Sequence, residues 1–570
     1  MADSQKPSAP AAAPRPPGPP PAKHPGFVTC TVDGREVVAR PGTLVIQAAR
    51  QAGIEIPHYC WHEKLSVAAN CRMCLVEMSN SPGGKLQPAC QAPVGEGVAV
   101  RTDTPRVKDQ QRATLEFLLL NHPVDCPICD QAGECKLQDY YMSYDRQPSR
   151  LDMAKQVKGK RISLGPTVTL DQERCILCTR CVRFMREVAK AEQLGVARRG
   201  SRSVIVTFPG QPLDHPYAGN VVDICPVGAL TSTDFRFRGR VWFMSSARSV
   251  CTGCSRGCNV HLDFMGETAY RLRPRVNEAV NSHWMCDGGR LTYKSFNEGR
   301  LLRARLGRGE GGREAGRAEA VAEAARQLRD HAGRGQLAAL LSPTASLEDL
   351  LAACRVARGL GLGEVYAGGR PDGTQDDFLK RADENPDRRG LELAAQGAGL
   401  ALRSLADLAR AIGDGKAKAL WAVGAEVPSA TANHVFARLE AFVCQATNQG
   451  EVARAATVLL PAAPAAECDG TFVSFEGRAQ RFERAWGPRG EARPHWALAA
   501  ELGRALGQPT AWTSAREVFQ SLGSGLALGD FRWDLPPAPR ARALEPPPAG
   551  TVDGRLPGYR EREPAAGGQG

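Results

Sequence analysis

The sequence predicts a multidomain protein that has α+β modules in its first half and an α/β domain in its second half. The chain has 570 residues, enough for roughly three to five domains of ordinary size. Fifteen of its 19 cysteines fall between Cys60 and Cys286, in recurring short spacings. After Leu301 only three cysteines remain, and Ala, Leu, Gly and Arg dominate the composition.

Composition excludes several classes of protein. Apolar residues make up 42% and charged residues 24%, which fits neither a wholly disordered chain nor a membrane bundle. Nowhere do about 18 apolar residues follow one another, so we expect no transmembrane segment. The net charge of +12 comes mostly from scattered arginines, without basic runs or interleaved aromatics, so we expect no nucleic-acid binding.

The beginning of the chain predicts a tail followed by a small domain. Residues 1–25 are rich in Pro and Ala and lack the apolar core of a secretory signal, so we expect them to be disordered. The stretch FVTCTVDGREVVA predicts two strands around an Asp33-Gly34 turn. A helix is expected from Thr43 to Ala52. A hairpin, a helix and then a Cys-bearing loop is the order of a β-grasp [2Fe–2S] ferredoxin, which we place at residues 26–105.

Further modules follow in order along the chain. A helix around Gln110 to Leu120 is expected to lead to His122 and the next Cys group. The segments AEAVAEAARQLRDHA and LAALLSP predict helices alternating with short buried strands. The expected ranges are 106–160 for a His–Cys module, 161–245 for a ferredoxin-like module, 246–300 for a further cluster module, 301–535 for the α/β domain and 536–570 for a loose tail.

The cysteines divide by spacing into four groups. Three groups contain four thiols, whereas the second contains three and has His122 close before it in HPVDCPICDQAGEC. With this histidine, every group has the four protein ligands that an iron–sulfur cluster requires. The groups are Cys60, Cys71, Cys74 and Cys90; His122, Cys126, Cys129 and Cys135; Cys175, Cys178, Cys181 and Cys225; and Cys251, Cys254, Cys258 and Cys286.

The spacings favour iron–sulfur clusters over zinc. A Cys-x2-Cys turn places two thiolates on one side of a tight loop whose backbone N–H groups point at the sulfurs, and a distant ligand closes the cage. Zinc sites normally use two separated pairs, whereas the triplets that begin at Cys175 and Cys251 are typical of ferredoxins. The first group departs from the plant-type spacing but still suits a [2Fe–2S] cluster. A neutral imidazole at His122 would ease reduction of the second cluster, because it replaces a negative thiolate.

Other motifs indicate no catalytic site. Cys30, Cys354, Cys444 and Cys468 stand alone, and we expect them to be free buried thiols. Gly307, Gly309 and Gly312 match a dinucleotide motif formally, but no apolar strand precedes them, so we interpret this stretch as a linker. No P-loop or HExxH motif occurs. The chain therefore offers no hydride acceptor of its own.

The order of the groups resembles the large iron–sulfur subunit of bacterial respiratory complex I, an NADH-quinone oxidoreductase; the family also includes the 75 kDa subunit. The resemblance covers about residues 27 to 300. It is carried by the segments PHYCWHEKLSVAANCRMCLVE, NHPVDCPICDQAGECKLQD, ERCILCTRCVRF with DICPVGAL, and CTGCSRGCNV with MCDGGR.

This resemblance implies one [2Fe–2S] cluster at the first group and three [4Fe–4S] clusters at the others. The chain would conduct electrons from the NADH and flavin site of one partner subunit toward quinone-site subunits, with protons pumped by the membrane arm. It would lie peripherally on the cytoplasmic side of the inner (plasma) membrane. As a subunit it belongs to an enzyme, but it has no NADH or quinone site and no catalytic residue of its own.

The region after residue 300 resembles a shortened molybdopterin-oxidoreductase domain, most clearly at Leu459 to Gln480. No residue matches the molybdenum ligand of such enzymes, so we expect no molybdopterin and interpret the domain as a scaffold. The main alternative is the catalytic subunit of an NAD-linked molybdenum formate dehydrogenase. An [FeFe]-hydrogenase-like chain would need further clustered cysteines after residue 300, and a zinc scaffold is the third alternative.

Overall fold

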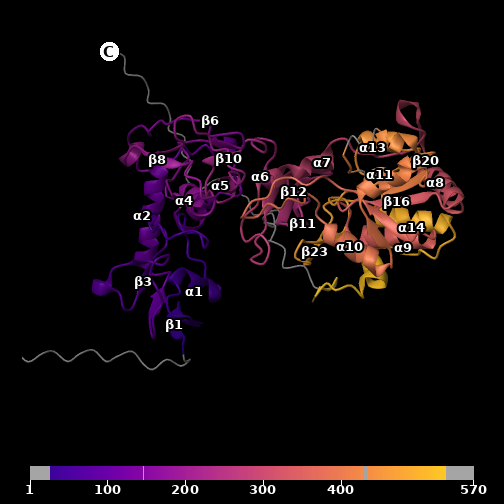
Figure 1. Ribbon diagram of the computed structural model, residues 1–570. Coiled ribbons are helices and arrows are strands. Elements are labelled where there is room, and N and C mark those ends of the chain that lie inside the picture. Colours follow the sequence, from indigo (N-terminus) through magenta and orange to yellow (C-terminus); the bar gives the residue numbers. More distant parts are fainter. Residues whose placement is uncertain (1–25, 146, 425, 429–433, 530, 534–570) are drawn as a thin grey trace, which may run out of the picture. The chain divides into compact units, whose positions relative to one another are not determined.

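The computed structural model describes residues 26–145, 147–424, 426–428, 434–529 and 531–533 (Figure 1). The chain divides into two compact units, Met1–Leu528 and Gly529–Gly570, and nearly all described residues belong to the first. The expected tail at 1–25 and that at 536–570 concern residues outside this description. The separate small sheets and one large, mostly parallel sheet confirm the predicted fold class.

The first sheet contains the predicted hairpin. Strands β1 (Val28–Val32) and β2 (Arg35–Ala39) are antiparallel, and Asp33 and Gly34 between them have φ angles of 49° and 80°. Two successive positive φ angles match the twist of a two-residue hairpin, which explains the Asp-Gly pair. Strands β3 (Leu75–Met78), β4 (Gln87–Pro88) and β5 (Ala99–Arg101) complete the order β2-β1-β5-β3-β4. Helix α1 (Val45–Gln51) is slightly shorter than predicted.

Helix α2 (Pro105–Asn121) starts more than one turn earlier than predicted. The cause is its N-terminus, where the Thr104 hydroxyl accepts the Val107 N–H at 3.3 Å and a proline fills the first helical position. The helix ends at Asn121, and His122 follows it as the C-cap residue. A short helix α3 (Lys136–Tyr140) follows the second Cys group.

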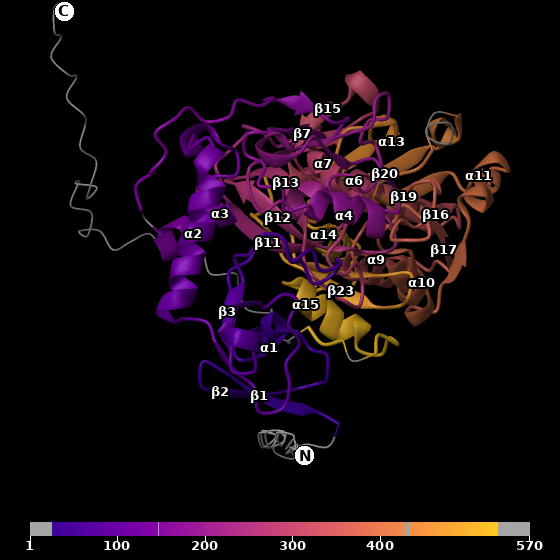
Figure 2. The same cartoon turned by 90° about the vertical axis from the view of Figure 1, so that its left-hand side faces the viewer.

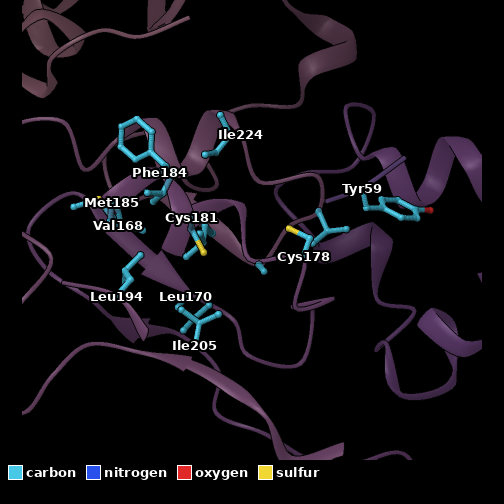
Figure 3. Packing of buried hydrophobic residues seen from close by; sticks show 14 of the residues in the cluster. Tyr59, Val168, Leu170, Cys178, Cys181, Phe184, Met185, Leu194, Ile205 and Ile224 are labelled. Atoms are coloured by element: carbon cyan, nitrogen blue, oxygen red, sulfur yellow. The ribbon is translucent and has the colours of Figure 1, made fainter. Parts of the chain in front are cut away.

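The third module is a small sheet covered by helix α4 (Arg180–Glu187). Strands β6 (Ile162–Ser163), β7 (Val168–Leu170) and β10 (Leu230–Ser232) form the sheet, β8 (Gly195–Ala197) and β9 (Val204–Val206) pair beside it, and α5 (Asn220–Asp223) precedes the last cysteine. Figure 3 shows its core, where Cys181 lies among apolar side chains such as Leu170, Ile205 and Phe184. The thiols of this group are therefore part of the hydrophobic core.

The fourth module is an antiparallel meander of β11 (Ser245–Val250), β12 (Asn259–Met265) and β13 (Thr268–Pro274). The loop between β11 and β12 carries three cysteines, and α6 (Asp287–Arg290) begins directly after Cys286. Helix α7 (Lys294–Asn297) leads on to the next domain.

The second half forms an eight-stranded sheet of order β15-β14-β21-β20-β19-β16-β17-β18, in which the six strands from β21 to β18 are parallel (Figure 2). Every residue of β16 and β19 is buried, as expected for parallel strands covered by helices on both faces. One face packs against α11 and α13. Helix α14 contacts both α8 and α9, and these two helices contact strands of the sheet. The bounds are β16 (Leu337–Leu341), β17 (Glu364–Ala367), β18 (Ala401–Arg403), β19 (Ala419–Val423), β20 (Ala441–Ala446), β21 (Val458–Pro461), α8 (Arg317–Ala332), α9 (Leu347–Gly359), α10 (Arg388–Gly397), α11 (Leu405–Gly413), α13 (Glu451–Ala455), α14 (His495–Ala505) and α15 (Ala515–Val518); β22 (Gly470–Val473) pairs with β23 (Ala479–Phe482) outside the sheet.

The interpretation of the glycine-rich stretch as a linker is wrong. Strands β14 (Ala304–Leu306) and β15 (Arg313–Ala315) form a hairpin around it. Strand β14 also pairs with β21, which lies far along the chain, and this long-range contact orders a segment that has no apolar alternation of its own. A side chain at Gly312 would place its Cβ 2.6 Å from the Gly307 carbonyl oxygen, so the turn requires glycine there.

No helix within the described ranges is long and apolar enough to cross a membrane.

A buried ion-pair cluster joins the fourth module to the large sheet. Glu467 has no exposed surface, and its two oxygens accept Arg300 Nη2 at 3.0 Å and Arg489 Nε at 2.9 Å. Arg489 also donates to the Phe296 carbonyl oxygen at 2.6 Å, at the end of the fourth module. Buried charges of this kind are costly unless each keeps its partner.

Replacing Glu467 with alanine is therefore expected to lower the unfolding free energy of the large-sheet domain by about 3 to 5 kcal/mol, because two buried guanidinium groups lose their carboxylate. Native-state hydrogen exchange in β20 and β21 measures this loss. The matched control is Glu323→Ala, which removes an ion pair with the exposed Arg326 and should change the free energy by less than about 0.5 kcal/mol. Equal protection in both variants would contradict the expectation.

Candidate metal centres

The four thiols of the first group interact directly with one another. Cys60 interacts with Cys71 and Cys90, and Cys74 interacts with Cys90. These interactions lower the pKa of Cys60 and raise the pKa values of Cys71 and Cys90, because a thiolate is stabilised by neighbours that must remain protonated. The four thiols lie together in the loops around β3, where a metal centre could be held.

The second group combines a histidine with three cysteines. His122, Cys126, Cys129 and Cys135 all line one cavity of about 880 Å³, whose wall also includes α2 and residues 147–152. The His122 Nδ1 atom is buried and has no hydrogen-bond partner among the described residues. Burial lowers the pKa of His122 to about 4, so the imidazole is neutral at pH 7. A neutral imidazole with a vacant nitrogen is the form that binds metal.

The third group encloses a narrow cavity. Cys175, Cys178, Cys181 and Cys225 line about 20 Å³ of space beneath α4. The N–H of Leu177 donates to Cys175 Sγ at 3.4 Å. Within the triplet, Leu177 and Thr179 have positive φ angles of 53° and 61°, which turn the backbone so that successive cysteines face the same side.

The fourth group lines a cavity of about 270 Å³, and its members are Cys251, Cys254, Cys258 and Cys286. The N–H groups of Gly253 and Gly289 donate to Cys251 Sγ and Cys286 Sγ at 3.4 and 3.3 Å. A Cβ atom at Gly289 would lie 3.0 Å from Cys251 Sγ, so this glycine lets the backbone approach both sulfurs. Backbone N–H groups directed at sulfur are the arrangement expected around cluster thiolates.

Two buried arginines of α4 connect the first and third groups, and the sequence motifs did not single them out. Arg183 Nη2 donates to the Cys60 and Cys178 carbonyl oxygens at 2.5 and 3.2 Å. Arg180 donates to the Trp61 and Ile224 carbonyl oxygens. Their positions within the motif TRCVRF were a possible signal, because Arg180 directly precedes Cys181 and Arg183 follows it by two residues.

Gly228 connects the second and third groups, and it too was missed. A Cβ atom at this position would lie 2.3 Å from Cys129 Sγ, so no other residue fits without movement. Gly228 follows Cys225 closely in DICPVGAL, and the Pro226 carbonyl oxygen accepts the N–H of Lys136 at 3.0 Å. The Cys loops of the two groups are thus packed directly against each other.

The residues fit iron–sulfur clusters in three respects. Each predicted set lies around one site, the thiols are mostly buried, and the set offers thiolates and one imidazole, which are soft ligands suited to iron or zinc. Burial and neighbouring thiols raise the pKa values of Cys175 and Cys178 to about 12 and 11, so these groups would ionise at pH 7 only against a cation. The thiols outside the groups, Cys30, Cys354, Cys444 and Cys468, are buried as predicted.

Exposed apolar side chains lie close to the second group. Val124 and Ile128 on its loop are 68% and 65% exposed. Segment 236–243 is fixed to this loop by Arg240, which donates to the Cys129 carbonyl oxygen at 2.7 Å, and by the Phe237 N–H, which donates to Asp130 at 2.9 Å. The exposed apolar residues of that segment are Phe237, Trp242 and Phe243.

Four family models match the chain in succession. A 2Fe-2S iron-sulfur cluster binding domain matches residues 27–105, and the NADH-ubiquinone oxidoreductase-G iron-sulfur binding region matches 111–150. The ferredoxin-like domain of NADH-quinone oxidoreductase subunit 3 matches 165–231, and molybdopterin oxidoreductase matches 337–505. Binding domains for both [2Fe–2S] and [4Fe–4S] clusters are therefore present.

Curated relatives match over about half of the chain. The G subunit of NADH-quinone oxidoreductase from Rickettsia bellii is 43% identical over 276 residues, which are 48% of this chain and 40% of that protein. The NADH-ubiquinone oxidoreductase 75 kDa subunit of Reclinomonas americana is 45% identical over 276 residues, 48% of this chain and 39% of that protein. The matches thus cover about two fifths of the relatives' length.

A solved structure, an NAD+-reducing [NiFe]-hydrogenase in the H2-reduced state, is 31% identical with a TM-score of 0.34, over 38% of this chain and 91% of that one. The relatives' names, the three successive iron–sulfur matches and the molybdopterin oxidoreductase match agree with the order of domains that the resemblance implied. Over about half of its length, the chain is therefore similar in sequence to the large iron–sulfur subunits of NADH-quinone and NADH-ubiquinone oxidoreductases.

Proposed function

We propose that this chain is an electron-transfer subunit of a proton-translocating NADH:quinone oxidoreductase. The observation that carries the proposal is the succession of four sites, each surrounded by four potential cluster ligands. The curated relatives, which are named as subunits of NADH-quinone or NADH-ubiquinone oxidoreductase, support the same function. The chain would take part in catalysis by conducting electrons between sites on other subunits.

The ligand assignments are part of this proposal. The thiolates of Cys60, Cys71, Cys74 and Cys90 would hold a [2Fe–2S] cluster, and the other three groups would each hold a [4Fe–4S] cluster. Such clusters accept and release single electrons. The chain's own residues bury the sites and direct backbone N–H groups at the sulfurs. They also place Arg180 and Arg183 between the first and third sites.

The proposed partners are a flavin-containing, NADH-binding subunit on one side and quinone-site connecting subunits on the other. The membrane arm would be reached through these, with the chain peripheral on the cytoplasmic side. The exposed apolar residues beside the second group, such as Ile128 and Trp242, support a protein partner at that position, because exposed apolar surface is typical of interaction sites.

The molybdenum formate dehydrogenase alternative is not favoured. The curated relatives are named for NADH-quinone and NADH-ubiquinone oxidoreduction. In the α/β domain, Cys354 lies in α9, Cys444 lies in β20 within the core, and Cys468 donates to the Pro464 carbonyl oxygen at 3.3 Å. These thiols serve packing, which supports a scaffold without molybdopterin.

Analysis of iron, acid-labile sulfide, zinc and molybdenum in the anaerobically purified full chain tests the proposal. One [2Fe–2S] and three [4Fe–4S] clusters predict about 14 iron atoms per chain, with sulfide in equal amount and without molybdenum. Stoichiometric molybdenum would instead support a molybdenum enzyme, and zinc in place of iron would contradict both functions.

A second prediction concerns His122, whose Nδ1 atom has no partner among the described residues. The variant His122→Ala should lose one [4Fe–4S] signal in electron paramagnetic resonance and about four iron atoms, while the other three clusters remain. His122→Cys should retain the cluster but lower its reduction potential, because a thiolate adds negative charge. The matched control is His62→Ala, since the His62 ring stacks on Trp284 and is not a predicted ligand. Four unchanged signals in His122→Ala would remove His122 from the ligand set.

A further inference from the structure

A segment of the α/β domain, residues 369–388, lies against the fourth Cys group. We refer to it as the bridging segment. Its Asp383 carbonyl oxygen accepts the Ser255 N–H at 2.9 Å, and its Leu379 carbonyl oxygen accepts Arg256 Nε at 3.2 Å. In the other direction, Arg370 Nη2 donates to the Thr252 carbonyl oxygen at 2.8 Å, between Cys251 and Gly253. The segment thus binds the Cys loop at three places.

The same segment also contacts the third module. The Tyr217 hydroxyl donates to Asp376 at 2.7 Å and accepts the N–H groups of Leu379 and Lys380 at 3.1 and 3.0 Å. Tyr217 is buried in the core that contains Cys178 and Cys181. The bridging segment is therefore attached both to the fourth Cys loop and to the third module.

The backbone of Arg370 is held rigidly. Asn385, which has no exposed surface, accepts the Arg370 N–H at 2.8 Å and donates to the Arg370 carbonyl oxygen at 2.9 Å. Gly369 next to it has φ of 109°, and a Cβ there would lie 2.6 Å from Asn385 Oδ1. The two hydrogen bonds from Asn385 fix the backbone of Arg370, whose side chain reaches the Cys loop.

The charge of Arg370 faces the fourth cavity. Arg370 lines this cavity together with the four cysteines. The Arg370 guanidinium donates to the carbonyl oxygen of Thr252 at 2.8 Å, so its charge lies beside the backbone that follows Cys251. Within the described part of the chain, Arg370 forms no ion pair that would cancel its charge, whereas Arg256 is paired with Glu476 at 3.6 Å. Lys380 also lines the cavity, but Glu384 lies 4.0 Å from its ammonium group.

We propose that Arg370 is a positioning residue that raises the reduction potential of the cluster held by Cys251, Cys254, Cys258 and Cys286. The inference rests on the proposed function, since it requires a cluster at this site. Reduction adds one electron and hence one negative charge, with no bond formed or broken, and a fixed cation nearby stabilises the reduced form. The α/β domain would then serve the electron-transfer chain by supplying this charge.

The test uses the full chain, purified anaerobically, and redox titration followed by electron paramagnetic resonance. Cys254→Ser identifies the signal of the fourth cluster. In Arg370→Gln, the ratio of reduced to oxidised fourth cluster at a fixed potential should fall about tenfold, which corresponds to about 59 mV for a one-electron couple. Arg370→Lys keeps the positive charge, so its ratio of reduced to oxidised fourth cluster should return close to that of the unaltered chain.

Controls separate the possible causes. Arg389→Gln removes an exposed arginine of α10 that pairs with Glu392, and it should leave all four potentials unchanged.

Unchanged potential of the fourth cluster in Arg370→Gln, with full iron content, would overturn the role of Arg370 and leave the proposed function intact. The absence of a signal sensitive to Cys254→Ser in the unaltered chain would overturn both the fourth site and this inference. If Arg370→Gln loses iron, the fourth cluster is titrated in Arg370→Lys instead. This variant keeps the positive charge, so a reduction potential about 59 mV below that of the unaltered chain would contradict the inference.

Discussion

The arrangement of the iron–sulfur modules depends on two buried guanidinium groups. Arg180 and Arg183 are both buried and both lie on the short helix α4. They donate to backbone carbonyl oxygens of the first and the third Cys loops. Buried cations are costly without negative charge nearby. Burial lowers the pKa of Arg180, and the adjacent Cys178 and Cys225 act in the opposite direction. Arginines and ionised thiols therefore stabilise each other, which ties the packing of two modules to the charge of their sites.

The α/β domain is attached to this core by contacts of two kinds. Glu467 with Arg300 and Arg489 forms a buried ionic link at the end of the fourth module. The bridging segment adds hydrogen bonds to the fourth Cys loop and to Tyr217. A domain that resembles a molybdopterin enzyme but packs its thiols into its core thus still has a definite place next to a redox site.

Features set by short-range sequence could be predicted, and those set by distant partners could not. The Asp33-Gly34 hairpin depends on neighbouring residues and was predicted correctly. The short Cys spacings are likewise local, and the ligand sets built on them stay predictions. Many strands have only two to four residues, too few for a periodic pattern. The hairpin of β14 and β15 escaped prediction because its order comes from pairing with β21. Arg183 and Arg370 were missed because they contact residues 123 and 118 positions away. Gly228 was missed because its role is to leave room for the Cys129 sulfur, which lies on a distant loop.

The close contact between Gly228 and Cys129 has a consequence for the shape of the second site. Gly228 belongs to the loop of the third group, yet it lines the cavity of the second group beside the Cys129 sulfur. The wall of one site is thus built partly by the backbone of the next, so a side chain added at Gly228 would disturb both sites at once.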